Sequence, residues 1–142
     1  TPDGQKIAFT SYLKRNPDLY LIDLNGRNLQ RFSSHPGLNV SPSWSPDGKL
    51  ILFTQRSVKE FSYPSLTIIN LDTPDQARRL NMGVLTIENV QFSSNGFWLA
   101  FEGGPGGPSD VYYMTATGAN LTQLTTNKKD DFDPVWRPIQ TP

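Results

Sequence analysis

The feature that most constrains this chain is a threefold internal repeat. A four-residue turn signal, Thr-Pro-Asp-Gly at residues 1–4, returns as Ser-Pro-Asp-Gly at 45–48 and as Ser-Ser-Asn-Gly at 93–96, so its glycines lie 44 and then 48 residues apart. Two series of aromatic residues keep step with the turns, namely Phe9, Phe53 and Phe101 after them and Trp44, Phe92 and Trp136 before them. Because three series recur together, the chain is predicted to consist of repeated structural units.

Each turn signal has a local physical meaning. Proline presets φ of the first central position, aspartate suits the second, and glycine takes the left-handed conformation that follows. Asparagine tolerates the same geometry, so Asn95 is an acceptable replacement for aspartate. The residues predicted to have this structural turn role are Asp3, Gly4, Asp47, Gly48, Asn95 and Gly96. Turn chemistry accounts for these acidic residues without a catalytic role.

Around each turn the sequence predicts four short strands and no helix. The first strands are expected at 40–44, 90–92 and 133–136, the second at 6–10, 50–54 and 98–102, the third at 19–24, 66–71 and 111–115, and the fourth at 29–32, 77–80 and 121–125. These segments are rich in β-branched and aromatic residues, and 11 Gly and 12 Pro are too many for a helical chain. Four antiparallel strands in 40–50 residues match one β-propeller blade.

The predicted fold is therefore an all-β propeller with three four-stranded blades, half of a six-bladed propeller. The expected units are blade 1 at about 1–37 without its first strand, blade 2 at about 38–85, blade 3 at about 86–129, and a first strand of the next or a partner blade within 130–142. Two explanations stay open. Two chains can exchange strands in a homodimer that completes six blades, or the chain is half of a longer propeller.

Composition argues against several classes of function. The 13 basic and 13 acidic residues balance, so the charge footprint of a nucleic-acid binder is missing, and no apolar run is long enough for a membrane helix. The chain has no Cys and one His, His35, which excludes thiol chemistry and any site with two imidazoles. No Gly-x-Ser-x-Gly elbow is present, and the acidic stretch 130–133 does not fit a calcium loop. We expect no catalytic, cofactor-binding or metal-binding residues.

Several motifs in register resemble the repeat of TolB-like, WD-repeat-like β-propellers. They lie at 45–54, 19–26, 120–125 and 133–136, and together the similarity covers nearly the whole chain. The departures from the pattern are Phe92, Ser94 and Asn95. The resemblance implies a propeller fold, an extracytoplasmic (periplasmic or secreted) location and a role in binding proteins. Similar propellers also stand beside the catalytic domain of prolyl-oligopeptidase-like serine peptidases.

Strand order predicts where a partner would bind. Loops between the second and third strands, and those from blade to blade, share one face, and they are long and varied: 11–18, 33–39, 55–65, 81–87, 103–110 and 126–132. Binding residues concentrate on such loops, and aromatics beside arginine are typical of protein interfaces. The candidate partner-binding residues are Tyr12, Lys14, Arg15, Arg56, Lys59, Phe61, Tyr63, Lys128 and Phe132. Glu60, Glu102, Asp130 and Asp131 are expected to add negative charge to this face.

The leading hypothesis is a non-catalytic scaffold that binds a protein or peptide through these loops. The alternative is a fragment of a propeller attached to a prolyl-oligopeptidase-like serine peptidase, whose Ser, Asp and His would lie elsewhere. A third hypothesis, a lyase or hydrolase acting in the central channel, has only His35 to support it.

Overall fold

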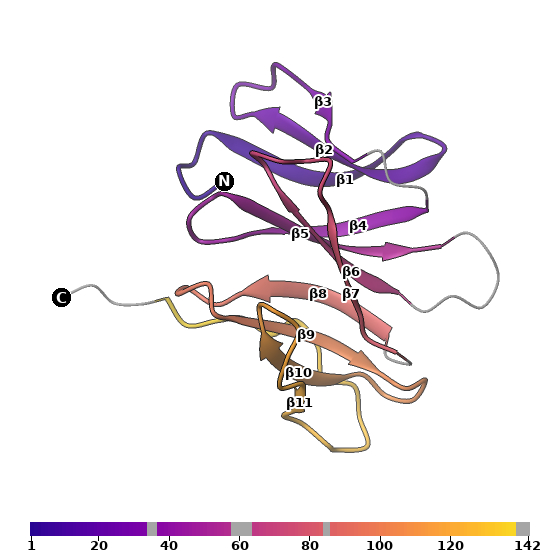
Figure 1. Cartoon of the computed structure of the whole chain (residues 1–142). Coiled ribbons are helices and arrows are strands. Elements are labelled where there is room, and N and C mark those ends of the chain that lie inside the picture. The colour runs from indigo at the N-terminus through magenta and orange to yellow at the C-terminus, as the bar shows by residue number, and fades with distance from the viewer. Residues whose placement is uncertain (34–36, 58–63, 84–85, 139–142) are drawn as a thin grey trace.

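The computed structural model describes residues 1–33, 37–57, 64–83 and 86–138, and all regular structure within them is β. Three antiparallel sheets lie one upon another along the chain (Figure 1). The first sheet has three strands in the order β1 (Lys6–Lys14), β2 (Asn16–Asp23) and β3 (Gln30–Arg31). This arrangement confirms the predicted all-β propeller fold.

The other two sheets each have four strands in chain order. The second consists of β4 (Leu38–Trp44), β5 (Leu50–Arg56), β6 (Ser65–Asn70) and β7 (Arg78–Asn81). The third consists of β8 (Thr86–Phe92), β9 (Trp98–Gly104), β10 (Asp110–Thr115) and β11 (Thr122–Gln123). Each sheet is a meander of the kind expected for a propeller blade.

Stacking of the sheets buries the core. Side chains on alternate positions of β5 and β6 point to opposite faces, so the second sheet has two apolar sides. One side packs on the first sheet through a cluster of Leu19, Ile51, Phe53 and Ile69. The other packs on the third sheet through Leu52, Leu66, Ile68, Phe101, Met114 and their neighbours. Each such side chain contributes about 1.5–3 kcal/mol on burial, so contact between sheets is what stabilises the fold.

The predicted loop at 11–18 is wrong. Its first residues continue β1 and its last residues begin β2, with Ser11 paired with Asp18 and Lys14 with Asn16. Arg15 alone reverses the chain, and its φ of 65° lies in the left-handed region. A single left-handed residue makes so tight a reversal that the strands keep pairing up to the tip.

The strand predicted at 133–136 is also not formed. Asp133 nevertheless has a φ of 55°, like Ser41 at 56° and Asn89 at 48°. Ser41 and Asn89 lie where the ladders of β4 and β8 shift register. Asp133 therefore shares the left-handed backbone of the first-strand residues Ser41 and Asn89, and the Trp136 indole N–H donates to the Gln91 carbonyl at 3.2 Å. No ladder forms because no strand in the described part of the chain follows it to supply hydrogen-bonding partners.

Candidate binding face

The three sheets have two different ends, which lie on opposite sides of the molecule in Figure 1. The turn face consists of the repeated turns at 1–4, 45–48 and 93–96. The loop face consists of the hairpin tip at 12–16 and the connections at 105–109 and 124–132. The sequence predicts a structural role for the turn face and partner binding for the loop face.

On the turn face, the three turns have the same backbone. Gly4, Gly48 and Gly96 have φ values of 68°, 71° and 73°. Each glycine N–H donates to the carbonyl three residues earlier, at 2.9, 2.9 and 2.8 Å respectively. Because the same glycine φ and the same turn hydrogen bond occur three times, we assign this part of each repeat a structural role.

Side chains of the turn face are bonded within their own turns. The Ser45 hydroxyl donates to Asp47 Oδ1 at 2.6 Å and accepts the Leu50 N–H at 2.9 Å. In the third turn Ser93 donates to Asn95 Oδ1 at 2.7 Å and accepts the Trp98 N–H at 3.0 Å. The asparagine therefore makes the same contacts as the aspartate that it replaces.

The turn carboxylates are held in their charged form. Hydrogen bonds from the Ser45 hydroxyl and then the Lys49 N–H lower the pKa of Asp47 below its ordinary value. The Thr1 hydroxyl and the Gln5 N–H lower the pKa of Asp3 in the same way. Local donors satisfy both carboxylates, which explains why these acidic residues are found in turns.

Consecutive turns also stack. A Cβ placed on Gly48 would lie 3.5 Å from Pro2 Cδ, and one on Gly96 would lie 3.6 Å from Pro46 Cδ. The third turn has Ser94 in the proline position, and its hydroxyl donates to the Arg137 carbonyl at 3.3 Å. The proline of one turn thus covers the glycine of the next, and Ser94 replaces that apolar contact by a hydrogen bond.

The loop face carries most of the predicted partner-binding residues. Tyr12 and Phe132 are 71% and 66% exposed, and Lys14, Arg15 and Lys128 are exposed as well. Lys59, Phe61 and Tyr63, like His35, lie outside the described residues. The residues that can be placed come from the first sheet, the second sheet and the segment after β11, so they form a row across the face rather than one cluster.

Arg56 has a role within the fold. It ends β5, and its guanidinium forms an ion pair with Glu88 of β8, which joins the second and third sheets. The two side chains remain 39% and 54% exposed. Such a pair contributes little stability, but it neutralises both charges on this part of the face.

Glu102 does not add the expected negative charge to the face. It is only 8% exposed, and its carboxylate accepts the Asn89 amide at 3.0 Å and the Asp133 N–H at 2.7 Å. Because its position in β9 points toward residues 133–136, it holds that segment beside the third sheet. Glu102 and Arg56 thus both drop out of the exposed charge of this face, the first by burial and the second by pairing with Glu88.

A buried polar network beneath the loop face was not predicted. Asp18 is 2% exposed and accepts Arg31 Nη2 at 2.7 Å and Asn39 Nδ2 at 3.1 Å. Asp110 occupies the same place in the third sheet and accepts Gln123 Nε2 at 2.8 Å and Thr125 Oγ1 at 3.2 Å. The Ser33 hydroxyl donates to Asp18 Oδ1 at 3.4 Å, as Thr125 does to Asp110. The signal was present in the sequence, because Asp18 precedes Ser33, and Asp110 precedes Thr125, by the same 15 residues.

A small polar cavity of about 320 Å³ lies where the first strands meet. Ser41, Asn89 and Asp133, the three residues with a left-handed backbone in first-strand positions, all line it. The Asn89 amide bridges Glu102 Oε1 and Asp133 Oδ1, the latter at 2.9 Å. Within the described ranges, no group of three or more His, Cys, Asp or Glu side chains is arranged to hold a metal ion.

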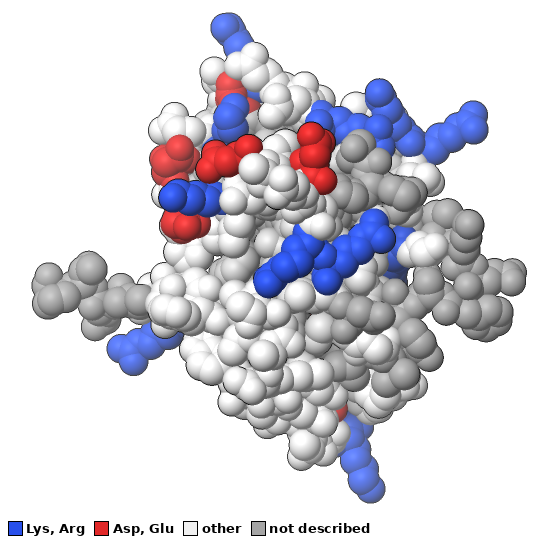
Figure 2. Space-filling model, viewed as in Figure 1, with Lys and Arg blue, Asp and Glu red and all other residues white. Residues whose placement is uncertain are grey.

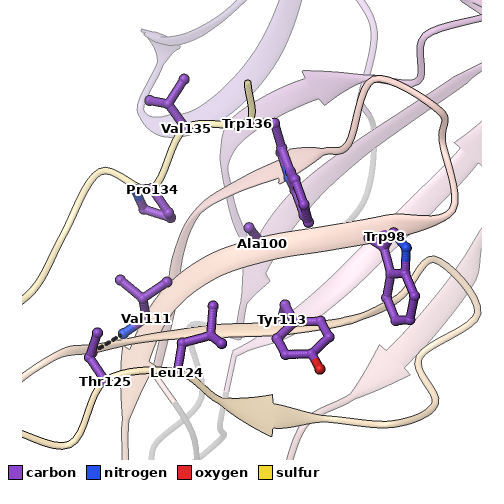
Figure 3. A pocket seen from close by; sticks show the side chains of 9 residues that line it. All are labelled: Trp98, Ala100, Val111, Tyr113, Leu124, Thr125, Pro134, Val135 and Trp136. Carbon is purple, nitrogen blue, oxygen red and sulfur yellow. Dashed lines mark hydrogen bonds between the residues drawn. The ribbon is translucent and has the colours of Figure 1, made fainter. Parts of the chain in front are cut away.

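The outward side of the third sheet forms a larger, apolar hollow of about 600 Å³ (Figure 3). Trp98 and Tyr113 meet edge to face at 5.5 Å there, and residues 134–136 lie along its rim. The matching side of the second sheet is the one buried against the third. We therefore interpret this hollow as an open stacking face for a further sheet rather than as a ligand pocket.

Among the residues that the structure describes, no helix is long and apolar enough to cross a membrane.

Comparison with known proteins agrees with this architecture. Residues 1–59 match the PD40 family, described as a TolB beta propeller domain. The Tol-Pal system protein TolB of Anaeromyxobacter dehalogenans is 31% identical over 120 residues, which cover 84% of this chain and 26% of that protein. The chain thus spans about a quarter of the length of this relative.

Solved structures show the same likeness. TolB from Acinetobacter baumannii superposes with a TM-score of 0.72 and 29% identity, covering 88% of this chain and 30% of that one. A prolyl endopeptidase superposes with a TM-score of 0.63 at 19% identity, over 88% of this chain and 21% of that one, which shows a shared fold alone. The repeated turns, the sheet order and these likenesses lead to one conclusion: the chain is similar to the TolB-like β-propeller repeat family.

Proposed function

We propose that this chain is a non-catalytic propeller scaffold that binds a protein or peptide through its loop face. The observation that carries the proposal is the difference between the two faces. The turn face bonds its polar groups within its own turns, whereas the loop face exposes Tyr12, Leu13 and Phe132 together with several cations. Exposed aromatics beside basic residues on a rigid scaffold are typical of protein interfaces.

A non-catalytic role is supported by the buried acids. Asp18, Asp110 and Glu102 each accept hydrogen bonds from groups that tie strands or segments together. Carboxylates engaged in this way serve the scaffold, since a general acid or base needs access to its substrate.

The relatives' name suggests the setting of the interaction. TolB is called a Tol-Pal system protein, so a protein component of such a system is the proposed class of partner. We propose an extracytoplasmic location, periplasmic or secreted, on the same resemblance. The partner would then be a protein met outside the cytoplasm.

The open stacking face suggests how the propeller is completed. Asp133 has the left-handed backbone found in the first strands of the second and third sheets, but residues 133–136 form no ladder. The first sheet has three strands among the described residues and no counterpart of β4 or β8. We propose that a second copy can supply the missing neighbours, giving a homodimer with six blades. Light scattering on a sizing column tests this: a stable peak at twice 15.9 kDa supports the dimer, and a folded monomer contradicts it.

Chemical cross-linking tests the proposed binding face. A partner captured from an envelope extract is cross-linked to the chain with an amine-reactive reagent, and the linked lysines are identified by mass spectrometry. We expect links at Lys14, Lys128 and Lys129 on the loop face. Lys49, beside the second turn, is the matched control on the turn face. Links that concentrate at Lys49 would contradict the proposal.

The peptidase-associated propeller remains the second candidate, on the strength of the fold shared with a prolyl endopeptidase. In that case a hydrolase domain would be encoded in the same open reading frame, and this stretch would orient or gate substrate. Reading the full gene distinguishes the two functions directly.

A further inference from the structure

We propose that the tip of the β1–β2 hairpin, residues 12–16, is a cationic and apolar finger that recognises an acidic segment of a protein partner. This inference rests on the proposed function, because it names one contact point of the loop face and the chemistry of what binds there. Four properties of the tip carry it: its shape, its exposed apolar surface, its charge and its backbone strain.

The tip is a continuation of the sheet rather than a loose loop. Lys14 pairs with Asn16 across the turn, and Arg15 makes the reversal by itself. The Ser11 hydroxyl accepts the Leu13 N–H at 3.3 Å inside the bulge between Ser11 and Lys14. This bulge disrupts the strand edge, so recognition at the tip goes through side chains rather than through an added strand.

The tip carries two open apolar side chains. Tyr12 and Leu13 are 71% and 65% exposed. Both lie in the bulge between Ser11 and Lys14, where the regular alternation of side chains along the strand is interrupted. Neither is covered by the core, so the finger presents two adjacent apolar residues for insertion into a partner's surface.

The charge of the tip has no partner in the described part of the chain. The ion pairs found there are Lys6 with Asp23, Arg31 with Asp18, and Arg56 with Glu88, and none involves Lys14 or Arg15. Asp18, the nearest acid along β2, is buried and bound to Arg31 and Asn39. Figure 2 shows Lys and Arg side chains projecting where the first sheet reaches the loop face.

The corresponding turn of the third sheet has the opposite character. Residues 105–109 read Pro-Gly-Gly-Pro-Ser and carry no charge, and no Lys or Arg occurs anywhere between Arg79 and Lys128. On the described part of the face, unpaired positive charge lies at two places, the tip and Lys128–Lys129. The second place is followed directly by Asp130 and Asp131, whereas residues 7–17 around the tip contain no acid. A complementary partner segment is acidic with an interspersed apolar residue, since charge complementarity sets which partner approaches and in which register.

Backbone strain permits a clean test. A left-handed backbone is unfavourable for arginine and easy for glycine, so Arg15→Gly removes a charge and relieves strain at once. If Arg15 serves only the turn, Arg15→Gly should keep or raise the Tm and leave peptide affinity unchanged. If Arg15 contacts a partner, the same substitution should keep or raise the Tm and weaken peptide binding.

The experiment measures fluorescence anisotropy of a labelled twelve-residue peptide of Glu-Glu-Leu repeats on the intact chain, beside an equal peptide of Lys-Lys-Leu repeats. We expect the acidic peptide alone to bind, more weakly as salt is raised. Arg15→Gly should weaken it about fivefold with an unchanged or higher Tm, and the pair Tyr12→Ser with Leu13→Ser should weaken it by a similar factor. Lys49→Ser on the turn face is the control and should bind like the parent.

Equal binding of both peptides, no binding of either at millimolar concentration, or undiminished binding by Arg15→Gly would each overturn the finger. Its failure is separable from failure of the proposed function. Partner cross-links that persist at Lys128 and Lys129 in the Arg15→Gly protein would refute the finger and keep the loop face. Cross-links at Lys49 would refute the loop face itself.

Discussion

The turn face and the loop face are opposite ends of the same three sheets, yet they follow different rules. On the turn face, Gly4, Gly48 and Gly96 share one φ within a few degrees and one hydrogen-bond pattern. On the loop face, the tip at 12–16 is charged and tightly paired, whereas 105–109 is uncharged and outside the strands. Repetition marks the end that builds the fold, and variation marks the end available for binding.

The two faces differ because side chains of the turn face hydrogen-bond within the turns, whereas side chains of the loop face are exposed to solvent. Ser45 and Asp47 of the turn face bond to each other and to their own backbone, so any change there acts on stability. Tyr12 and Phe132 of the loop face are mostly in solvent, so changes there leave the fold intact. The comparison therefore predicts that equal substitutions at the two ends have unequal effects.

The largest difference is expected for glycine. Gly48→Val places a β-branched residue at a φ of 71° beneath Pro2, which should lower the free energy of unfolding by about 3 kcal/mol. A Cβ on Gly107 of the loop face would meet no atom within 4 Å, so Gly107→Val should change the free energy of unfolding by less than about 0.5 kcal/mol. Urea unfolding of both variants makes the measurement, and equal midpoints would remove the distinction between the faces.

Replacing a turn serine by alanine is expected to have the second-largest effect on the free energy of unfolding. Ser45 is 4% exposed, and Ser45→Ala leaves the Leu50 N–H without its acceptor, at an expected cost of about 2 kcal/mol in unfolding free energy. Ser109→Ala, on the loop face, should cost less than about 0.5 kcal/mol. A thermal melt compares them, and an effect of Ser109→Ala as large as that of Ser45→Ala would speak against the comparison.

Low pH should weaken the turns that contain aspartate and leave the turn that contains Asn95 unchanged. The folded-state pKa of Asp47 is lowered, so its stabilising effect is complete above its unfolded-state pKa and is lost as pH falls through the lower folded-state value. Below about pH 4, the amide of Lys49, which donates to Asp47 Oδ1, should lose protection from hydrogen exchange. The equivalent amide of Phe97, which donates to Asn95 Oδ1, should keep its protection, and parallel loss at both amides would contradict this mechanism.

The smallest effect is expected for Asp47→Asn. Asn95 already makes the same contacts in the third turn, so this variant should lose no more than about 0.5 kcal/mol at neutral pH. It should also show a weaker fall of Tm in acid than the parent chain. Circular dichroism at several pH values checks both points, and a large loss at neutral pH would show that the two turns are not equivalent.

Local signals predicted most of the fold. The turn signals and the aromatics at fixed spacing located the strands of all three sheets, because short-range chemistry sets both turns and alternation. The predictions were wrong where contacts with segments distant in the sequence determine strand pairing or burial. A strand at 133–136 needs a ladder partner, a loop at 11–18 was replaced by pairing up to Arg15, and Glu102 is covered by a segment 31 residues away.

The candidate face shows the same division. Strand order correctly assigned Tyr12, Lys14 and Lys128 to one end of the sheets. The sequence did not reveal that Leu13 is as exposed as its neighbour, or that Arg56 is paired with Glu88. Exposure and pairing depend on what packs from the adjacent sheet, which a local pattern does not contain.

By itself, the sequence determined the repeat, the turn geometry and the β-propeller class, since proline, glycine and alternating apolar residues act on the nearest few bonds. Only the tertiary structure decided which charges remain free, because each sheet buries or neutralises groups of the next. Stacking turned Glu102 and Asp18 inward, and among the residues that the structure describes it left Lys14 and Arg15 outside any ion pair. The face that we propose for binding is thus what remains after the sheets have paired their polar groups with one another.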